Sequence, residues 1–522
     1  MAGDKRLLIS LLKWLFGVLA SFALLVVAAR LLFPLPDLQA RAPSAAIPLS
    51  KDTAWGRGLA AAARDHPGKS GVVPLATGHE ALASRLLLTA QAERSLDVQY
   101  YIWHDDISGR LLLRALADAA RRGVRVRLLL DDNGVSGMDA TLAALNAQDN
   151  VEVRLFNPSR VRRPKLAGYL FDFFRMNRRM HNKAFIVDGA AAIIGGRNVG
   201  DEYFSIGEQN YFLDLDVLAA GSVVSETAVN FDLYWNSGSA YPIDAVAPDA
   251  DTRLPDWLMA GGASPEAEWL KRMPELEASA AGRLNSGDIV LEWTDARLFS
   301  DPPSKGLGKA KPGELMISQL NSVLGPVRKK LDVISAYFIP GKKGTDYFRS
   351  VRSAGTEVNI LTNALKSTDV AMVHAGYSKY RRRLLEAGIA LYELKPRPGM
   401  PDGASELSAS GSSGSSLHAK TLSVDGQRVF VGSFNFDPRS VYLNCEMGFL
   451  IESASMARHI HEAFTRDIAR NAYRVELHDG ELRWIETGPD GATTVLETEP
   501  DASLVDRIML TVFGWLPIEW LL

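Results

Sequence analysis

Runs in which apolar and polar residues alternate are separated along the chain by stretches with helical spacing. Residues 96–103, LDVQYYIW, alternate in this way and are rich in β-branched and aromatic side chains, which predicts a strand. Residues 108–132 follow with a helical stretch that ends at Gly123 and a second, buried strand. A third strand is expected in residues 150–158. Strands that alternate with helices predict right-handed crossovers and a mostly parallel sheet.

The same succession of elements returns in the second half of the chain, at residues 331–338, 345–364 and 388–396. We therefore expect two homologous α/β sandwich halves that form a pseudo-dimer within one chain. The halves are predicted over residues 75–255 and 285–472.

Both ends of the chain carry apolar segments. Residues 7–29 contain one charged residue, Lys13, and a membrane-spanning helix needs roughly 20 apolar residues. We predict a transmembrane anchor in residues 1–35, with the N-terminus inside the cell and the body outside. A cleaved signal peptide is the alternative, because Lys5 and Arg6 precede the run and VVAA resembles a processing site.

The C-terminal region, residues 473–522, is predicted to contain a small β-meander and then an apolar helix. The helix, within residues 506–522, fits either a membrane surface or a docking position on the protein's own core. Residues 403–416, rich in Gly and Ser, are expected to form a flexible loop.

Composition excludes several classes of protein. A length of 522 residues exceeds what one hydrophobic core usually organises, which agrees with two domains. Hydrophobic residues make up 47%, charged residues 23%, and the net charge is −3, so a general polyanion binder is not indicated and no nucleic-acid partner is expected. Cys445 is the single cysteine, which excludes an intramolecular disulfide and a cysteine-built zinc site.

Two segments carry the same chemically distinctive residues at the same spacing. The first motif, residues 181–198, reads HNKAFIVDGAAAIIGGRN, and the second, residues 418–435, reads HAKTLSVDGQRVFVGSFN. Each motif is predicted to begin on a strand, with its His and Lys on one face. Five fixed residue types that recur twice are far too specific a pattern to arise by chance.

Brought together across a pseudo-twofold axis, the motifs would place two imidazoles between two ammonium groups. Lysines and amides suit a tetrahedral anion. Two histidines suit displacement at phosphorus: one attacks and forms a phosphohistidine, and the other protonates the leaving alcohol and deprotonates the incoming one. Neither a metal nor a cofactor is expected, because Lys183 and Lys420 would repel a cation.

The pattern H-x-K-x4-D-x6-G-[GS]-x-N in two copies resembles the phospholipase D superfamily. The resemblance implies a nucleophile and a general acid/base, His181 and His418, and phosphate ligands, Lys183, Lys420, Asn198 and Asn435. His181 is expected to be the nucleophile. Ser433 offers a further hydroxyl for phosphate, whereas the first motif has Gly196 there, so the two half-sites should differ. Asp188 and Asp425 are expected to support the site.

Downstream carboxylates are expected to hold each imidazole in one tautomer. LDLD supplies Asp214 and Asp216, and NCEMG supplies Glu446. An alignment of N-x-E with D-x-D pairs Glu446 with Asp216.

Longer segments, among them YYIWHDDISGRLLL, NRRMHNKAFIVDG and VHAGYSKYRRRLL, resemble bacterial cardiolipin synthases of the C type over residues 75–522. This resemblance implies transfer of a phosphatidyl group from phosphatidylethanolamine or phosphatidylglycerol to phosphatidylglycerol, giving cardiolipin. We expect the bacterial inner membrane as the location, with the body on the periplasmic face as the orientation predicted for the anchor requires. The apolar N-terminal segment lies outside the resemblance, so the topology of relatives does not transfer to this chain. Residues 165–180 interleave aromatic and basic side chains, as expected of an anionic lipid surface or of an amphipathic helix packed on the body.

A membrane-bound hydrolytic phospholipase D is the nearest alternative, because water competes with lipid for a phosphohistidine. A nuclease on the same scaffold and an inactive membrane scaffold are less favoured. The identity of the donor and any need for a companion protein stay open.

Overall fold

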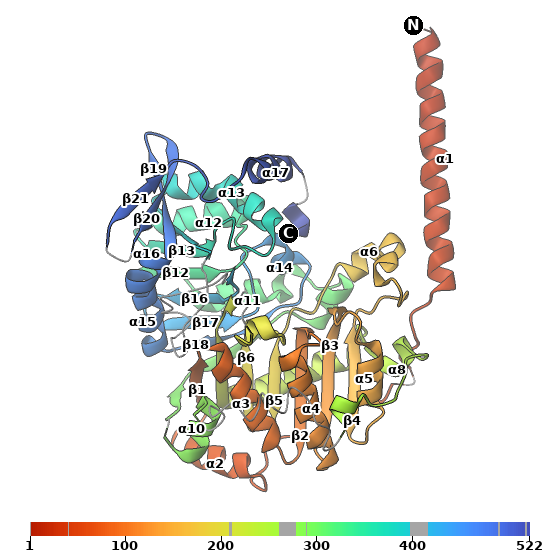
Figure 1. The fold of residues 1–522 in the computed structure, drawn as a ribbon, viewed down its shortest axis with the longest axis vertical. Coiled ribbons are helices and arrows are strands. Elements are labelled where there is room, and N and C mark those ends of the chain that lie inside the picture. Colours follow the sequence, from red (N-terminus) through yellow and green to blue (C-terminus); the bar gives the residue numbers. More distant parts are fainter. Residues whose placement is uncertain are drawn as a thin grey trace.

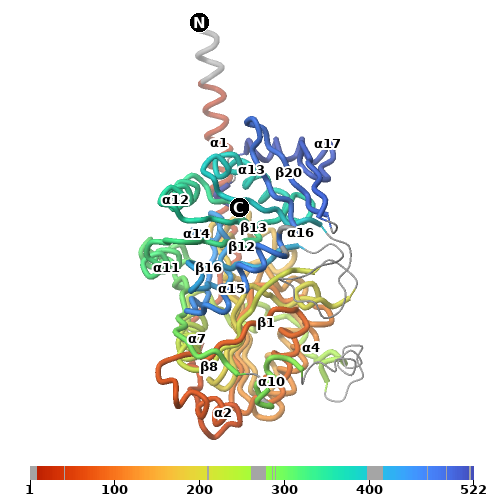
Figure 2. The backbone as a smooth tube through the Cα atoms, turned by 90° about the vertical axis from the view of Figure 1, so that its left-hand side faces the viewer, coloured from red at the N-terminus to blue at the C-terminus, as the bar shows by residue number. Residues whose placement is uncertain are grey.

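The computed structural model describes residues 2–39, 41–207, 211–259, 278–288, 290–396, 416–488, 491–516 and 519–522. Two sheets with their helices are stacked on each other, and a long N-terminal helix projects from the body (Figure 1). Figure 2 shows the second half, green to blue, lying against the first half, red to yellow. The predicted loop at residues 403–416 lies outside the described residues except for Ser416.

The N-terminal helix α1 (Ala2–Leu32) contains a segment, Ile9–Leu32, with a mean hydropathy of 2.4 and no burial against the body. At 1.5 Å per residue, its 24 residues span about 36 Å, which is enough to cross a hydrocarbon core of about 30 Å. Where α1 ends, Arg30 Nε donates to the carbonyl oxygen of Phe171 at 2.8 Å. Phe33 stacks on the Phe171 ring at 6.0 Å.

The first sheet has nine strands within the described residues. Their order is β10 (Glu292–Thr294), β1 (Ser70–Leu75), β8 (Asp216–Gly221), β6 (Ala191–Gly195), β5 (Ala184–Val187), β2 (Ser95–Ile102), β3 (Arg125–Gly134), β4 (Val151–Phe156) and β9 (Ala240–Pro242). One face is covered by α3 (Gly78–Ala90), α4 (Ile107–Arg121) and α5 (Asp139–Asn146). The other face packs against α7 (Ser222–Trp235).

The second sheet repeats this plan. Its order is β11 (Ala296–Ser300), β18 (Met447–Ile451), β17 (Arg428–Gly432), β16 (Lys420–Val424), β12 (Lys330–Ser335), β13 (Glu357–Asn363), β14 (Ala390–Leu394), β19 (Ala472–His478), β20 (Glu481–Thr487) and β21 (Thr493–Leu496). One face packs against α11 (Met316–Leu324), α12 (Gly341–Ser353) and α13 (Ala371–Glu386), and the other against α15 (Ala454–Glu462).

Smaller elements complete the fold. The shorter helices described are α2 (Ala54–Ala62), α6 (Tyr169–Met176), α8 (Ile243–Val246), α10 (Ala280–Ser286), α14 (Pro438–Tyr442), α16 (Ala469–Asn471) and α17 (Leu504–Trp515). One hydrophobic cluster joins β6 and β8 of the first sheet to β17 and β18 of the second, so the halves share a core. This shared core fixes the two halves relative to each other, as the predicted pseudo-dimer requires.

The prediction of a mostly parallel sheet is wrong. Among the described strands, β2, β3 and β4 pair in parallel, as do β12, β13 and β14, while every other pair within the two large sheets is antiparallel. The cause lies in the motifs themselves. Asp188 and Gly189 have φ values of 52° and 60°, as Asp425 and Gly426 have 55° and 68°. Such left-handed pairs make tight turns, and each motif therefore forms an antiparallel hairpin, β5–β6 or β16–β17.

The boundaries of the halves also differ in detail from the prediction. The first sheet begins at Ser70 and also includes β10, which follows the predicted end of the first half in the sequence. The second sheet begins at Ala296. The predicted β-meander is present as β19–β21, but it joins β14 and extends the second sheet instead of standing apart. Helix α17 packs against α13, as the docking interpretation of the C-terminal helix predicts, and it still exposes apolar side chains, with Trp515 83% exposed.

Candidate active site

Each motif histidine lies at the boundary between the two halves of the protein, where its backbone pairs with the opposite half. His181 comes just before β5, not on it, and its backbone N–H donates to the carbonyl oxygen of Cys445 at 2.8 Å. In the second half, β15 (Ser416–Leu417) pairs with β7 (Phe212–Leu213), and the His418 N–H donates to the Leu213 carbonyl oxygen at 2.8 Å. The expectation that each motif starts on its own strand is therefore wrong, because the backbone leaves its sheet at the histidine to pair with the opposite half.

Each imidazole is held by a carboxylate of the opposite half. His181 Nδ1 lies 2.8 Å from Glu446 Oε2, and His418 Nδ1 lies 2.6 Å from Asp214 Oδ2. A carboxylate accepts hydrogen bonds but cannot donate when ionised, so Nδ1 carries the hydrogen and Nε2 keeps its lone pair. Both histidines are therefore oriented for attack or for proton transfer through Nε2.

The predicted equivalence of Glu446 with Asp216 is wrong. Gly195 lies opposite Asp216 in the first sheet, whereas its motif equivalent Gly432 lies opposite Gly448. Asp214 thus takes the place that corresponds to Glu446. Asp216 instead forms a buried ion pair with Arg85 at 2.8 Å, behind the histidine partners.

Burial and mutual repulsion shape the charges in the site. Burial lowers the pKa of His181 to about 4 and that of His418 to about 3, so both imidazoles are neutral at pH 7. The pKa of Asp214 is lowered to about 2: burial raises it, but His418, Lys420 and Arg197 together outweigh burial. The pKa of Glu446 is lowered in the same way, against burial, by His181, Lys183 and the hydrogen bond from Ser433. The histidines are thus neutral and their partners ionised.

The motif lysines are buried beside the histidines. Lys183 Nζ donates to the His181 carbonyl oxygen at 2.7 Å, and Lys420 Nζ donates likewise to that of His418. Burial lowers the pKa of Lys183 to about 7 and that of Lys420 to about 8, and Lys420 further lowers the pKa of Lys183. Two ammonium groups that repel each other in a buried place form a site for an anion such as phosphate.

The burial of the Lys183 charge, together with its repulsion by Lys420, predicts that Lys183→Met stabilises the protein at neutral pH. The folded chain gives up the Lys183 proton near pH 7, while an unfolded lysine keeps it to about pH 10.4. Below pH 7 the full cost of the buried charge is present, and stability rises with pH between these values. We expect Lys183→Met to lose that pH dependence. At pH 7 its free energy of unfolding should be higher than that of the wild type by about 1–3 kcal/mol, and its unfolding temperature should rise accordingly.

Thermal unfolding followed by circular dichroism in detergent, from pH 6 to 10, measures this effect. Lys305→Met is the matched control, because Lys305 is equally buried but pairs with Asp301 at 2.7 Å. That variant should be destabilised, since it leaves Asp301 without its cation. A Lys183→Met protein that unfolds at lower temperature than the wild type at pH 7 would contradict the prediction.

The two motif asparagines are held in the same way, whereas Ser433 has a different kind of partner. Asn198 Oδ1 and Asn435 Oδ1 accept hydrogen bonds from the backbone N–H groups of Ile102 and Tyr337, at 3.2 and 3.3 Å. The Ser433 hydroxyl donates to Glu446 Oε2 at 2.5 Å. The structure therefore gives this hydroxyl to the histidine's carboxylate partner and not to the space in front of the histidines, where the sequence interpretation had placed a phosphate.

Gly196 is required by the geometry of Asp214. A Cβ atom at Gly196 would lie 2.1 Å from Asp214 Oδ1, so even alanine must displace that carboxylate. The second half accommodates Ser433 at the equivalent place and uses it to hold Glu446. The two half-sites thus differ, as predicted, in how each carboxylate is held.

We expect Gly196→Ala to lower turnover about 10–100-fold with little loss of stability, because Asp214 moves away from His418 Nδ1. Gly58→Ala is the control, since nothing lies within 4 Å of a Cβ atom there. The measurement is the initial rate of headgroup release from lipid vesicles alongside a thermal melt. Equal rates for the two variants would show that Asp214 tolerates the shift.

Asp188 and Asp425 support the site from behind. The Asp188 carboxylate accepts from the backbone N–H groups of residues 93–95 at 2.8 to 3.0 Å. The Asp425 carboxylate accepts from those of residues 328–330 in the same manner. Each therefore ties the hairpin turn of its motif to the start of the neighbouring strand.

Several residues near the histidines were missed from the sequence. Tyr101 packs edge-on against His181 at 5.0 Å, and Tyr203 against His418 at 5.1 Å. Asp131 in β3 and Asn363 at the end of β13 accept from the backbone N–H groups of Met180 and Leu417, the residues just before the two histidines. Asp131 and Asn363 occupy equivalent places in the repeat, and this equivalence is a signal that would have found those two residues.

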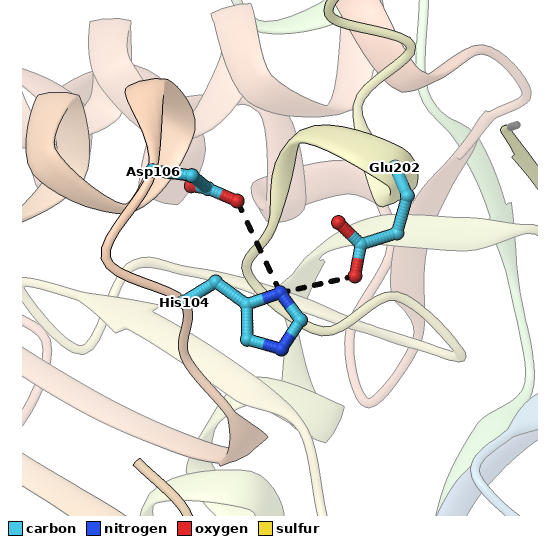
Figure 3. A group of neighbouring side chains, drawn as sticks. All are labelled: His104, Asp106 and Glu202. Carbon is cyan, nitrogen blue, oxygen red and sulfur yellow. Dashed lines mark ion pairs between the residues drawn. The ribbon is translucent and has the colours of Figure 1, made fainter. Parts of the chain in front are cut away.

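A histidine and two carboxylates gather beside the first motif (Figure 3). His104 Nδ1 lies 3.1 Å from Glu202 Oε1 and 4.0 Å from Asp106 Oδ2. The hydrogen bond that His104 donates to Glu202 raises the pKa of His104. Asp106 also caps α4 and accepts from the Asp201 N–H at 2.8 Å. The group therefore fastens the loop after β2 to the loop after the first motif.

Comparison with known proteins agrees with this arrangement. The profile described as "Cardiolipin synthase, PLD-like domain" matches residues 87–235 and again 320–468, one match for each half. The chain belongs to the cardiolipin synthase family. Within this family, cardiolipin synthase C of Escherichia coli K12 is 44% identical over 465 residues, which cover 88% of this chain and 97% of that protein.

More distant members and one solved structure extend the comparison. A cardiolipin synthase of Staphylococcus aureus Mu50 is 27% identical over 372 residues, 71% of this chain and 62% of that protein. The crystal structure of a phosphatidylserine synthase from Haemophilus influenzae matches with a TM-score of 0.54 at 13% identity, covering 89% of this chain and 99% of that one. That likeness shows the fold: two phospholipase D-like α/β halves in one chain.

Proposed function

We propose that the protein is a cardiolipin synthase that transfers a phosphatidyl group to phosphatidylglycerol through a phosphohistidine. The observation that carries the proposal is the pair of neutral histidines, each held by an ionised carboxylate of the opposite half, at 2.8 and 2.6 Å, with a buried lysine beside each. Family membership and the 44% identity to cardiolipin synthase C support the same reaction.

The first half-reaction begins when phosphate of the donor lipid binds between Lys183 and Lys420. His181 Nε2 attacks phosphorus, the bond from phosphorus to the headgroup oxygen breaks, and His418 gives its Nε2 proton to that oxygen. His418 takes up this Nε2 proton from water when the donor lipid binds, because the bound anion favours a protonated imidazole although burial otherwise lowers the pKa of His418 to about 3. The headgroup alcohol leaves, and the phosphatidyl group stays on His181.

In the second half-reaction a free glycerol hydroxyl of phosphatidylglycerol takes the place of the departed alcohol. His418 Nε2 removes the hydroxyl proton as the oxygen attacks phosphorus, and the bond to His181 breaks. Cardiolipin is released, and both histidines return to their starting state. The motif amides Asn198 and Asn435 complete the phosphate site in this scheme.

We place the body at the surface of a bacterial inner membrane, held by α1, with the site on the periplasmic side. Helix α6 exposes Leu170 and Phe174, 73% and 68%, close to where Arg30 at the end of α1 meets Phe171. These apolar side chains can enter the lipid interface beside the anchor. A site at that level meets both lipid substrates without extracting them into water.

Lipid mass spectrometry tests the proposal in cells that lack their own cardiolipin synthases. The cells express the wild type or His418→Ala, with isotope-labelled phosphatidylethanolamine and phosphatidylglycerol. Cardiolipin that forms only with the intact site is the expected result, and the label in its phosphatidyl groups identifies the donor. Phosphatidic acid without cardiolipin would instead assign a hydrolytic phospholipase D and contradict the proposal.

A further inference from the structure

An exposed carboxylate lies at the edge of the site, on the loop between β13 and α13. Asp369 Oδ2 accepts a hydrogen bond from the Tyr337 hydroxyl at 2.6 Å. Tyr337 is half-buried, while Asp369 is exposed to solvent. The carboxylate therefore has a fixed position and a free side toward the outside.

The pair belongs to the same site as the motifs. The Tyr337 backbone N–H is the donor to Asn435 Oδ1, at 3.3 Å. Burial lowers the pKa of Lys420, and Asp214, Glu446 and Asp369 each act to raise it. Burial raises the pKa of Tyr337, and so do Asp369 and, more weakly, Tyr203, the ring that packs against His418. Asp369 is thus close enough to act electrostatically on the phosphate-binding lysine.

The first half lacks this pair. Ile102 gives its backbone N–H to Asn198 as Tyr337 does to Asn435, so Ile102 occupies the equivalent place without a hydroxyl. Counted from the equivalent positions Asp131 and Asn363, Gly137 stands where the second half has Asp369. The phosphate ligands are duplicated and this carboxylate is not, so it serves something that the two half-sites do not share.

A carboxylate beside an anion site repels phosphate and attracts hydrogen-bond donors. The two ends of a phospholipid phosphate differ in this respect: the diacylglycerol end has no free donors, and the headgroup end has the hydroxyls of glycerol or the ammonium of ethanolamine. We propose that Asp369, held by Tyr337, recognises the headgroup alcohol by accepting hydrogen bonds from its hydroxyl or ammonium groups. This inference rests on the proposed function and names the substrate group that the carboxylate selects.

A competition among soluble alcohols tests the inference. The full-length protein acts on phosphatidylglycerol vesicles in an equimolar mixture of ethanolamine, deuterium-labelled glycerol and 1-propanol. Mass spectrometry measures the three phosphatidyl alcohols formed, and the deuterium distinguishes newly formed phosphatidylglycerol from the donor lipid. The wild type should favour ethanolamine and glycerol. In Asp369→Asn, the ratio of each to the propanol product should fall about tenfold, as expected for loss of a charged hydrogen bond. Tyr337→Phe should lower the ratios less, because the carboxylate remains but is no longer held.

Product ratios separate recognition from a general effect on the site. If Asp369 acts only through Lys420 or through folding, all three products decline together and the ratios stay constant, which would overturn the inference. Asp346→Asn is the matched control, an exposed carboxylate on α12 that pairs with Lys342 and should leave the ratios as in the wild type.

Failure of the proposed function gives a different result. A protein that only hydrolyses lipid forms no phosphatidyl alcohol, and its release of headgroup from phosphatidylethanolamine, phosphatidylglycerol and phosphatidylpropanol then supplies the same ratios. An Asp369→Asn protein that keeps the wild-type preference in that release would overturn the inference, whichever reaction the enzyme performs.

Discussion

Replacement of His181 or His418 by alanine is expected to abolish phosphatidyl transfer, with a loss of at least about 10⁴-fold in rate. Each histidine supplies a function that the other cannot supply at the same moment, because one holds the phosphatidyl group while the other moves the proton. The double variant should be little worse than either single one, since residues that act as a unit do not contribute additively. Rates of headgroup release from labelled vesicles measure all three variants.

The same variants identify the nucleophile. With His181 as the attacking residue, His418→Ala can still form a covalent phosphatidyl-enzyme slowly, whereas His181→Ala cannot. Acid-quenched protein incubated with lipid labelled in the phosphate separates the two cases. A covalent adduct in His181→Ala and none in His418→Ala would reverse the assignment. His104→Ala is a suitable control, because His104 lies beside the first motif but pairs with Glu202 in the group that joins two loops (Figure 3).

The second large effect concerns the carboxylates that cross between the halves. We expect Asp214→Asn and Glu446→Gln to lower the transfer rate by about 10²–10⁴-fold while the fold is kept. An amide can present its NH₂ group to Nδ1, and the hydrogen then sits on Nε2, the atom that must attack phosphorus or move a proton. The ionised partner that stabilises a protonated imidazole is lost as well.

The two amide variants should differ in how activity depends on pH and on which step slows. Asp214→Asn affects His418 and therefore the proton transfers, and Glu446→Gln affects His181 and therefore adduct formation, as measured by rapid quench. Asp216→Asn tests the corrected pairing, since Asp216 lies on Arg85 and not on a histidine. A larger effect of Asp216→Asn than of Asp214→Asn on proton transfer would contradict the assignment of Asp214 to His418.

The sequence was sufficient for the duplication and for the residues of the two motifs, because both depend on spacing along the chain. It was not sufficient for contacts between the halves. The D-x-D and N-x-E segments can be aligned in two ways, and only the strand register, with Gly195 opposite Asp216 and Gly432 opposite Gly448, decides between them. The prediction of strand direction was wrong for a similar reason. The hairpin turn at Asp188 depends on backbone angles that residue patterns indicate only weakly.

Aromatic residues around the histidines were also beyond the sequence. In the sequence, nothing distinguishes Tyr101 from the other residues of an alternating strand. Tyr203 follows the first motif in a short turn. Their positions against His181 and His418 result from the docking of two sheets, which no local pattern encodes. Asp369 and Gly137 show the converse: once the structure fixes the alignment of the repeats, a departure from symmetry becomes visible in the sequence itself.

The crossing of carboxylates between the halves has a consequence for biosynthesis. Glu446 follows His181 by 265 residues, so a ribosome adding about 5–20 residues per second delivers the carboxylate roughly 10 to 50 seconds after the histidine. During that interval α1 has already left the ribosome, and the first half has its histidine without the acceptor that orients it. The growing chain therefore reaches the lipid bilayer without a complete site. It can act on phospholipids only after Glu446 has been added, when translation is almost complete.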